Sequence, residues 1–217
     1  YLLFPDRSRL AITHEKVEQF AAQFLEDPAK VPLSVKKAVD FQACSICPRR
    51  HTGEFCHALR PTLPFLEITD RYVSFDQVTA VFRERGNGLF HVKHTTMQKA
   101  LQYVSVLSLI HYCETGRKYL RYFLGVMPLM EMKEVAERIF LNIFWNCRGD
   151  AGKIKEIVTQ FVEEIRITSA CQIKRLNTIC KSDPFLNAFA AVQAATELVS
   201  MMNDEVLERS FNDFEKE

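Results

Sequence analysis

The sequence predicts a mainly α-helical protein that folds as a single domain, with about six to eight helices, one β-hairpin near residues 77–93 and a cysteine-rich loop at 44–57. Three observations lead to this prediction. Apolar residues recur at helical spacing over most of the chain. They alternate with polar residues near the hairpin, which is the period of a strand. Three of the seven cysteines lie within the one short loop.

The N-terminal part is predicted to open with an amphipathic helix. Thr13 is a suitable N-cap, and Val17 and Phe20 begin an apolar face that continues to Glu26. A proline at position 28 then ends the helix. Two further short helices are predicted before the hairpin, at 34–41 and 63–70.

Residues 77–93 show the period of a β-strand. Val78 and Ala80 alternate with more polar neighbours, residues 86–88 (Gly-Asn-Gly) can adopt the positive φ of a tight turn, and the alternation resumes at Phe90. A two-stranded ribbon is marginally stable in water, so we expect this hairpin to lie against helices or to join another sheet.

The rest of the chain is predicted to be helical. Thr95 or Thr96 can cap a central helix, and Asp183-Pro184 places a capping side chain before a proline at the first position of a long final helix. The helices predicted after the hairpin are 95–114, 117–124, 131–145, 150–166, 168–180 (capped by Thr168 or Ser169) and 183–209.

The chain is long and apolar enough to bury a core without disulfides, because it has 217 residues of which 47% are hydrophobic. We therefore expect one domain, 1–217, in which an N-terminal part, 1–94, packs on a C-terminal helical bundle, 95–217.

Charge and motifs argue against several functional classes. A net charge of +1 gives no global field that would attract nucleic acid or an anionic membrane, so nucleic acid is not indicated as a partner. The seven glycines form neither a dinucleotide-binding nor a P-loop motif. H-E-x-x-H and G-x-S-x-G are also absent. The sequence therefore favours a role without catalysis.

Cysteine usage and hydropathy suggest where the protein resides. An odd number of cysteines, most of them inside predicted helices, is unlike a secreted disulfide framework. The longest near-apolar stretch, 103–113, is about half of the roughly 20 residues that a membrane-spanning helix needs, and we expect it to be a buried core helix. We therefore expect a cytoplasmic protein with no membrane segment.

The loop at 44–57 is the strongest candidate for a site. Cys44 and Cys47 form a C-x2-C pair, in which two intervening residues allow a tight turn to aim both thiolates at one metal. Cys56 follows closely enough in the chain to supply a third ligand. The sequence therefore predicts a metal site with these three cysteines as its nucleus.

The fourth ligand of this site is open between three residues. His51 lies within the loop and His57 directly follows Cys56, so either histidine is an alternative. Cys113, at the end of the predicted central helix, would complete a set of four thiolates and is the ligand that we predict. Four thiolates suit either tetrahedral Zn²⁺ or a [4Fe-4S] cluster.

The loop also resembles known cluster-binding sequences. The pattern Cys44-x2-Cys47-Pro-Arg, followed by Phe55-Cys56-x2-Leu59, resembles the three-cysteine stretch of FNR-type oxygen-sensing regulators, which hold a [4Fe-4S] cluster with a remote fourth cysteine. It is also similar to the C-x2-C-P-x-R cluster segments of some CRISPR-associated and recombination nucleases. The resemblance covers about 20 residues and implies a cluster, but neither DNA binding nor nuclease activity.

Two local features favour the cluster slightly over zinc. A proline follows Cys47, as it does beside some cluster ligands. Arg49 and Arg50 leave the loop cationic, which offsets the negative charge of four thiolates. The sequence thus predicts a metal-binding protein with a redox-sensing, regulatory or electron-transfer accessory role and a protein partner. The alternative is a helical protein-interaction module with a purely structural zinc site. The oligomeric state is not predicted.

Overall fold

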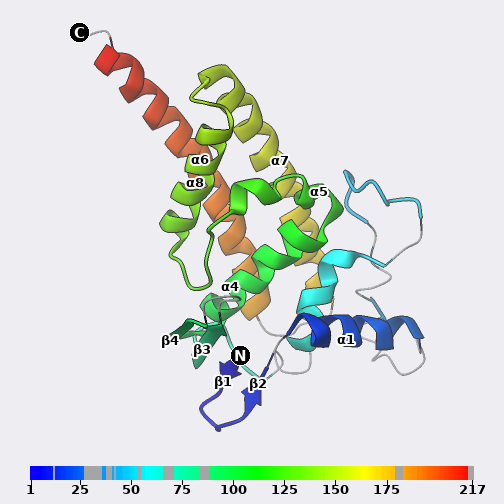
Figure 1. Ribbon diagram of the computed structural model, residues 1–217. Coiled ribbons are helices and arrows are strands. Elements are labelled where there is room, and N and C mark those ends of the chain that lie inside the picture. The colour runs from blue at the N-terminus through cyan, green and yellow to red at the C-terminus, as the bar shows by residue number, and fades with distance from the viewer. Residues whose placement is uncertain are drawn as a thin grey trace.

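The computed structural model describes residues 1–11, 13–26, 36–37, 41, 43–52, 55–65, 71–83, 88–178 and 183–214. Helices dominate these residues and one small antiparallel sheet accompanies them, so the predicted fold class is confirmed. Figure 1 shows the longer helices gathered above the sheet, with the N-terminal helix below and to one side. The main helices of this group are α4 (Met97–Val106), α6 (Met132–Asn146), α7 (Ala151–Leu176) and α8 (Pro184–Phe214).

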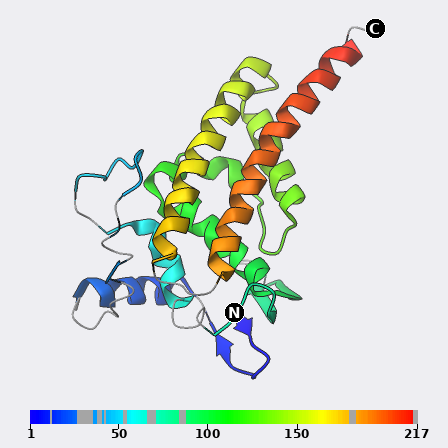
Figure 2. The ribbon, with the colours of Figure 1, turned by 180° about the vertical axis from the view of Figure 1, so that it is seen from behind.

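The helices α7 and α8 run antiparallel, side by side, along the length of the bundle (Figures 1 and 2). Each contributes a stripe of side chains at helical spacing that is almost fully removed from water. The stripes consist of Ile154, Val158, Phe161 and Ile165 on α7, and of Phe185, Phe189, Val192 and Val199 on α8. The same hydrophobic core extends through α4 and α6 to Leu2 and Val78 in the sheet.

This packing accounts for part of the apolar composition of α8. By length and composition, Pro184–Met202 is the one helix among the described residues that is apolar enough to cross a membrane. It is not the stretch 103–113 that the sequence analysis considered. Its large apolar side chains Phe185 and Phe189 are fully buried against neighbouring helices, as in a core helix.

The prediction of a helix break near residue 167 is wrong, because α7 continues through it. Thr168 does not cap a new helix: its hydroxyl donates to the carbonyl oxygens of Glu164 (2.9 Å) and Ile165 (3.1 Å) within the same helix. Ser169 is likewise buried inside α7. The predicted helix 117–124 is also replaced, by a single α-turn, α5 (Glu114–Arg117), and a 3₁₀ turn, η3 (Leu120–Phe123).

The predicted hairpin is present and belongs to a four-stranded sheet. β3 (Gln77–Arg83) pairs antiparallel with β4 (Phe90–Thr96), and Gly88 adopts a φ of +71° near the turn, whose residues 84–87 lie outside the described part. Two short strands that the sequence analysis did not predict, β1 (Leu2–Leu3) and β2 (Arg9–Leu10), extend the sheet in the order β2-β1-β3-β4. They supply the additional pairing that an isolated ribbon lacks.

The N-terminal helix α1 (His14–Glu26) is where the sequence predicts it, with Thr13 as its cap: the Lys16 amide donates to the Thr13 hydroxyl (3.2 Å). It packs on η1 (His57–Phe65), a 3₁₀ helix that contains two prolines. Arg60 of η1 pairs with Glu18 of α1. The helix predicted at 34–41, apart from positions 36–37 and 41, and residues 66–70 of the one predicted at 63–70 lie outside the described residues.

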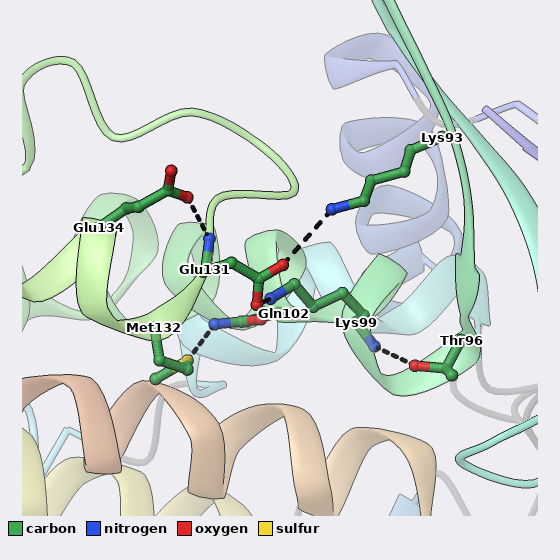
Figure 3. Close-up of polar contacts among 7 residues, drawn as sticks. All are labelled: Lys93, Thr96, Lys99, Gln102, Glu131, Met132 and Glu134. Carbon is green, nitrogen blue, oxygen red and sulfur yellow. Dashed lines mark hydrogen bonds and ion pairs between the residues drawn. The ribbon is translucent and has the colours of Figure 1, made fainter.

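A polar junction joins the sheet to the bundle at the start of α6 (Figure 3). The Glu131 carboxylate accepts from Lys99 of α4 and from Lys93 of β4, the latter at 3.4 Å. The Glu131 backbone amide donates to Glu134 (2.6 Å), which completes a capping box for α6. Glu131 thus caps the N-terminus of α6 and links α6 to α4 and β4 through its contacts with the two lysines.

Replacing Thr96 by alanine is expected to destabilise the fold by about 1 kcal/mol, the typical cost of losing an N-cap. Of the two threonines considered as caps of α4, Thr96 is the one whose hydroxyl accepts from the Lys99 amide (3.4 Å). Urea unfolding followed by circular dichroism measures the loss. Thr96→Ser keeps the hydroxyl and should unfold like the wild type, and an equal loss in both variants would contradict the assignment.

Candidate metal centre

One cavity brings together the four cysteines that the sequence analysis selected. It has a volume of about 60 Å³, and Cys44, Cys47, Cys56 and Cys113 all line it. Its walls come from the cysteine loop, from the segment after α4 and from α7. The fold therefore carries the remote Cys113 to the three local cysteines.

The cysteine loop is folded by successive tight turns. The Cys47 amide donates to the carbonyl oxygen of Cys44 (3.0 Å), and the Arg50 amide donates to that of Cys47 (3.1 Å). Pro48 begins the second turn, where its fixed φ is compatible with the backbone. These turns place both cysteines of the C-x2-C pair in the lining of the cavity.

The position of Cys113 depends on a change from α-helix to π-helix just before it. After α4 the chain continues as a π-helical turn, η2 (Leu107–Tyr112), in which the Cys113 amide donates to the Ser108 carbonyl oxygen (3.0 Å). The backbone of Cys113 is then extended, with φ −73° and ψ 126°. Ser108 also donates its hydroxyl to the Ala58 carbonyl (2.5 Å), which fixes η2 close to Cys56.

Two contacts fasten the cysteine loop to the residues that follow Cys113. The Arg49 guanidinium lies 3.0 Å from the Glu114 carboxylate. The Thr115 hydroxyl donates to the Ile46 carbonyl oxygen (3.4 Å). The loop and α5 are thus held together by groups that leave the four thiols to face the cavity.

The third wall, α7, presents polar side chains. The Gln172 amide group donates to the Cys56 sulfur (3.5 Å). Arg175, which is fully buried, donates to the side-chain oxygen of Gln172 (3.3 Å) and to the Phe41 carbonyl oxygen (3.4 Å). A buried guanidinium is costly to desolvate and is stabilised by nearby negative charge.

Burial affects the protonation of the thiols. It raises the pKa of Cys113 to about 11, although the nearby amides of Gly116 and Thr115 favour the thiolate. A hydrogen bond with Cys171, together with burial, raises the pKa of Cys44, and the same hydrogen bond lowers that of Cys171. Cys44 and Cys113 therefore carry protons in the metal-free protein, and metal binding there would release them.

The structure distinguishes the alternative ligands and adds a cysteine. His57 lines the cavity, whereas His51 is exposed and is not among the lining residues. Cys171 of α7, which was not among the predicted ligands, forms a hydrogen bond with Cys44. The signal that could have revealed this wall is that the helical spacing of the apolar stripe on α7 places Gln172 and Arg175, two large polar residues, at buried positions.

The spacing of the ligands matters for the kind of metal. Within the described ranges, no group of three or more His, Cys, Asp or Glu side chains lies in an arrangement that could hold a metal ion. Four thiolates around one zinc, at Zn–S distances of about 2.3 Å, would have to converge tightly. In a [4Fe-4S] cluster each cysteine binds a different iron, so the sulfurs are farther apart.

A second cavity, of about 410 Å³, lies between β4, α4, α6 and α8. Its charged groups are those of the polar junction, and Lys93 and Lys99 are paired there with Glu131 (Figure 3). These charges offset one another in part, so this cavity is the weaker candidate for a functional site.

Comparison of the chain with protein-family models, with curated proteins and with solved structures gave no match.

Proposed function

We propose that this protein binds a metal cofactor through Cys44, Cys47, Cys56 and Cys113, and that the cofactor is a [4Fe-4S] cluster rather than a zinc ion. The observation that carries the proposal is the single cavity lined by all four thiols, three from one loop and one from a distant helix end. Four cysteine thiolates are the ligand set of such a cluster.

The size of the cavity supports the cluster over zinc. A cavity needs roughly 10–15 Å³ to hold one water molecule. The thiol-lined cavity, at about 60 Å³, offers several times that space. A single tetrahedral ion needs its ligands to close around it and leaves little room. A group larger than one ion fits the space between these thiols better.

The charges around the cavity support an anionic occupant. Four thiolates exceed the positive charge of a [4Fe-4S] core, so the bound cluster is negative overall. The guanidinium of Arg175 in α7 is fully buried beside the cavity, whereas Arg49, which lines the cavity from the loop, is paired with Glu114. Gln172 donates to the Cys56 sulfur, and such hydrogen bonds to ligand sulfurs help to set a reduction potential. These residues would stabilise the cluster and tune it.

The biological role that fits this site is redox sensing, regulation or electron transfer as a cytoplasmic accessory to a partner protein. The cluster would supply one-electron chemistry and sensitivity to oxidants. The loop contacts α5 through the Arg49–Glu114 ion pair and the long Thr115–Ile46 hydrogen bond, and a cofactor bound by Cys113 would add a further link between the two. Exposed apolar side chains offer a surface for a partner near the hairpin, at Phe75, Leu89, Phe90 and Val92.

Anaerobic purification tests the proposal directly. We expect brown protein with broad visible absorption, about four iron atoms and four sulfides per chain, and loss of colour in air. Iron, zinc and acid-labile sulfide are measured on the same sample. If the protein is colourless and contains one equivalent of zinc, the cysteines bind a metal but the proposed cluster is wrong. If the protein retains neither iron nor zinc after reconstitution, the proposal that these cysteines bind a metal is wrong.

The second candidate is a helical interaction module in which zinc at these cysteines is purely structural. The exposed apolar side chains in and near the hairpin favour it, because exposed apolar surface that is contiguous commonly marks a protein-binding site. Metal analysis separates the two candidates, since only the cluster contains iron and sulfide.

A further inference from the structure

We propose that the cavity of about 410 Å³ between β4, α4, α6 and α8 binds a small organic carboxylate, a monoanion whose other polar groups are hydroxyls or amides. This cavity is separate from the four cysteines, because none of the residues that line it also lines the thiol-lined cavity. A ligand could therefore bind here whether or not the cysteines hold a metal.

The size and the lining of the cavity fit a small polar molecule. Ligand pockets in proteins typically measure roughly 300–1,000 Å³ and hold a few polar groups that fix the orientation of the ligand. Here Met132 and Ala191 are the apolar lining residues, and all the other side chains that line the cavity are polar or charged. Such a lining favours a ligand rich in hydrogen-bonding groups.

The charge of the cavity fits a monoanion. The ammonium groups of Lys93 and Lys99 face the carboxylate of Glu131, and no other charged side chain of the described residues lines the cavity. Hydrogen bonds from Lys99 and Lys93 lower the pKa of Glu131, so its carboxylate is ionised at neutral pH. The cavity therefore has one positive charge in excess. A carboxylate would balance it, whereas a phosphate monoester carries close to two negative charges at this pH.

The two lysines keep hydrogen-bond donors for the ligand. An ammonium group has three N–H groups. Within the described part of the chain, the Glu131 carboxylate is the one polar partner of both ammonium groups, which converge on it in Figure 3. The side chain of Lys99 is only 16% exposed, and a charge so far removed from water is stabilised by an anionic partner. A ligand carboxylate beside Glu131 would accept from the N–H groups that Glu131 does not use.

Gln102 gives the cavity a second, uncharged recognition group. Its side chain lines the cavity and is buried, at 7% exposed. Its amide nitrogen donates to the thioether sulfur of Met132, which is a weak acceptor. Among the described residues this side chain has no other hydrogen bond. Because buried polar groups normally have partners, we expect a ligand hydroxyl to donate to the Gln102 oxygen.

Titration of the full chain with three six-carbon probes tests the charge requirement. Gluconate, glucose and glucose 6-phosphate are similar in size and hydroxyl content but carry one, no and about two negative charges. Two-dimensional ¹H–¹⁵N NMR measures the affinity and locates the site through the amide signals that shift. We expect gluconate to bind best, at least about tenfold more tightly than glucose, with the largest shifts at Lys99, Gln102 and Glu131.

Three outcomes of this titration would overturn the proposal. They are no binding of gluconate at millimolar concentration, equal binding of gluconate and glucose, and shifts that lie away from the cavity. Tighter binding of glucose 6-phosphate than of gluconate would also contradict it, because the excess charge would then not select a monoanion.

Lys99→Gln should weaken gluconate binding by at least about tenfold, because hydrogen bonds between charged groups are worth that much. Lys133→Gln is the matched control. It removes the same charge, but Lys133 is an exposed residue of α6 that does not line the cavity, and this variant should bind gluconate like the wild type. Equal weakening in both variants would show an effect of net charge alone and would contradict the proposed site.

Glu131→Gln tests the proposal in the opposite direction, which a damaged fold could not imitate. Glutamine keeps a side-chain oxygen that can cap α6, but it removes the one negative charge of the cavity. We expect tighter binding of gluconate and a shift of preference towards glucose 6-phosphate. Unchanged or weaker binding in a variant with the circular dichroism of the wild type would contradict the proposal, even if Lys99→Gln failed to fold.

Discussion

Replacing Cys113 by serine is expected to lower the iron and sulfide content of reconstituted protein by at least about tenfold, because losing a ligand should cost no less than losing a supporting residue around a metal site. Serine is close to cysteine in size, and Cys113 is 9% exposed, so the wall of the cavity keeps its shape. A hydroxyl, however, is a much poorer ligand than a thiolate for iron bound through sulfur. Metal and sulfide analysis, with far-ultraviolet circular dichroism as a check of folding, measures the effect.

Cys147→Ser is the matched control. Cys147 is also buried, at 7% exposed, but it lies at the end of α6 in the hydrophobic core and does not line the cavity. This variant should retain its metal. Full metal content in Cys113→Ser would show that Cys113 is not a ligand, and His57, which also lines the cavity, would become the next residue to test.

Replacing Gly116 by alanine is expected to destabilise the protein by more than about 4 kcal/mol. Few single substitutions cost this much, and those that do usually disrupt the packing of the core. A Cβ at this position would overlap the carbonyl oxygen of Leu109 and would lie 2.8 Å from its carbonyl carbon. Both atoms belong to the backbone of η2, which cannot rotate away as a side chain can. Urea unfolding measures the loss, and the metal content of the folded fraction should fall too, because η2 positions Cys113.

Gly152→Ala supplies the comparison. Gly152 is in the first turn of α7, and a Cβ there would meet only a side-chain oxygen of Asp150, at 3.5 Å. Alanine favours a helix over glycine by roughly 0.5–1 kcal/mol, so this variant should be as stable as the wild type or slightly more stable. Similar unfolding of the two variants would contradict the close approach of α5 to η2.

The elements with strong local signals were predicted well from the sequence. Thr13 and Thr96 are caps because their hydroxyls accept from amides three residues on, and that pattern is visible in the sequence. β1 and β2 were missed because two residues are too short to show a period. The false break at Thr168 arose because a good capping residue can instead bond backward within a helix.

The residues of the candidate site also fall into those that the sequence could predict and those that it could not. Cys44, Cys47 and Cys56 stand out because their spacing is local. Cys113 could be suggested only as a remote cysteine at a helix end, and the cavity now supports that choice over His51. Cys171 and Arg175 were not found, because their proximity to the loop depends on how α7 packs, and no spacing in the sequence encodes that contact.

The π-helical turn η2 has a consequence at the level of the gene. Its closing hydrogen bond, from Cys113 back to Ser108, spans five residues where a regular α-helix spans four. The turn thus contains one residue more than the corresponding turn of a regular α-helix. A single inserted codon would add such a residue. Removing that codon would let α4 run on regularly and rotate Cys113 by about 100° about the helix axis, away from the other thiols. A length change of one amino acid, with every cysteine still present, would be enough to gain or lose the four-thiol site.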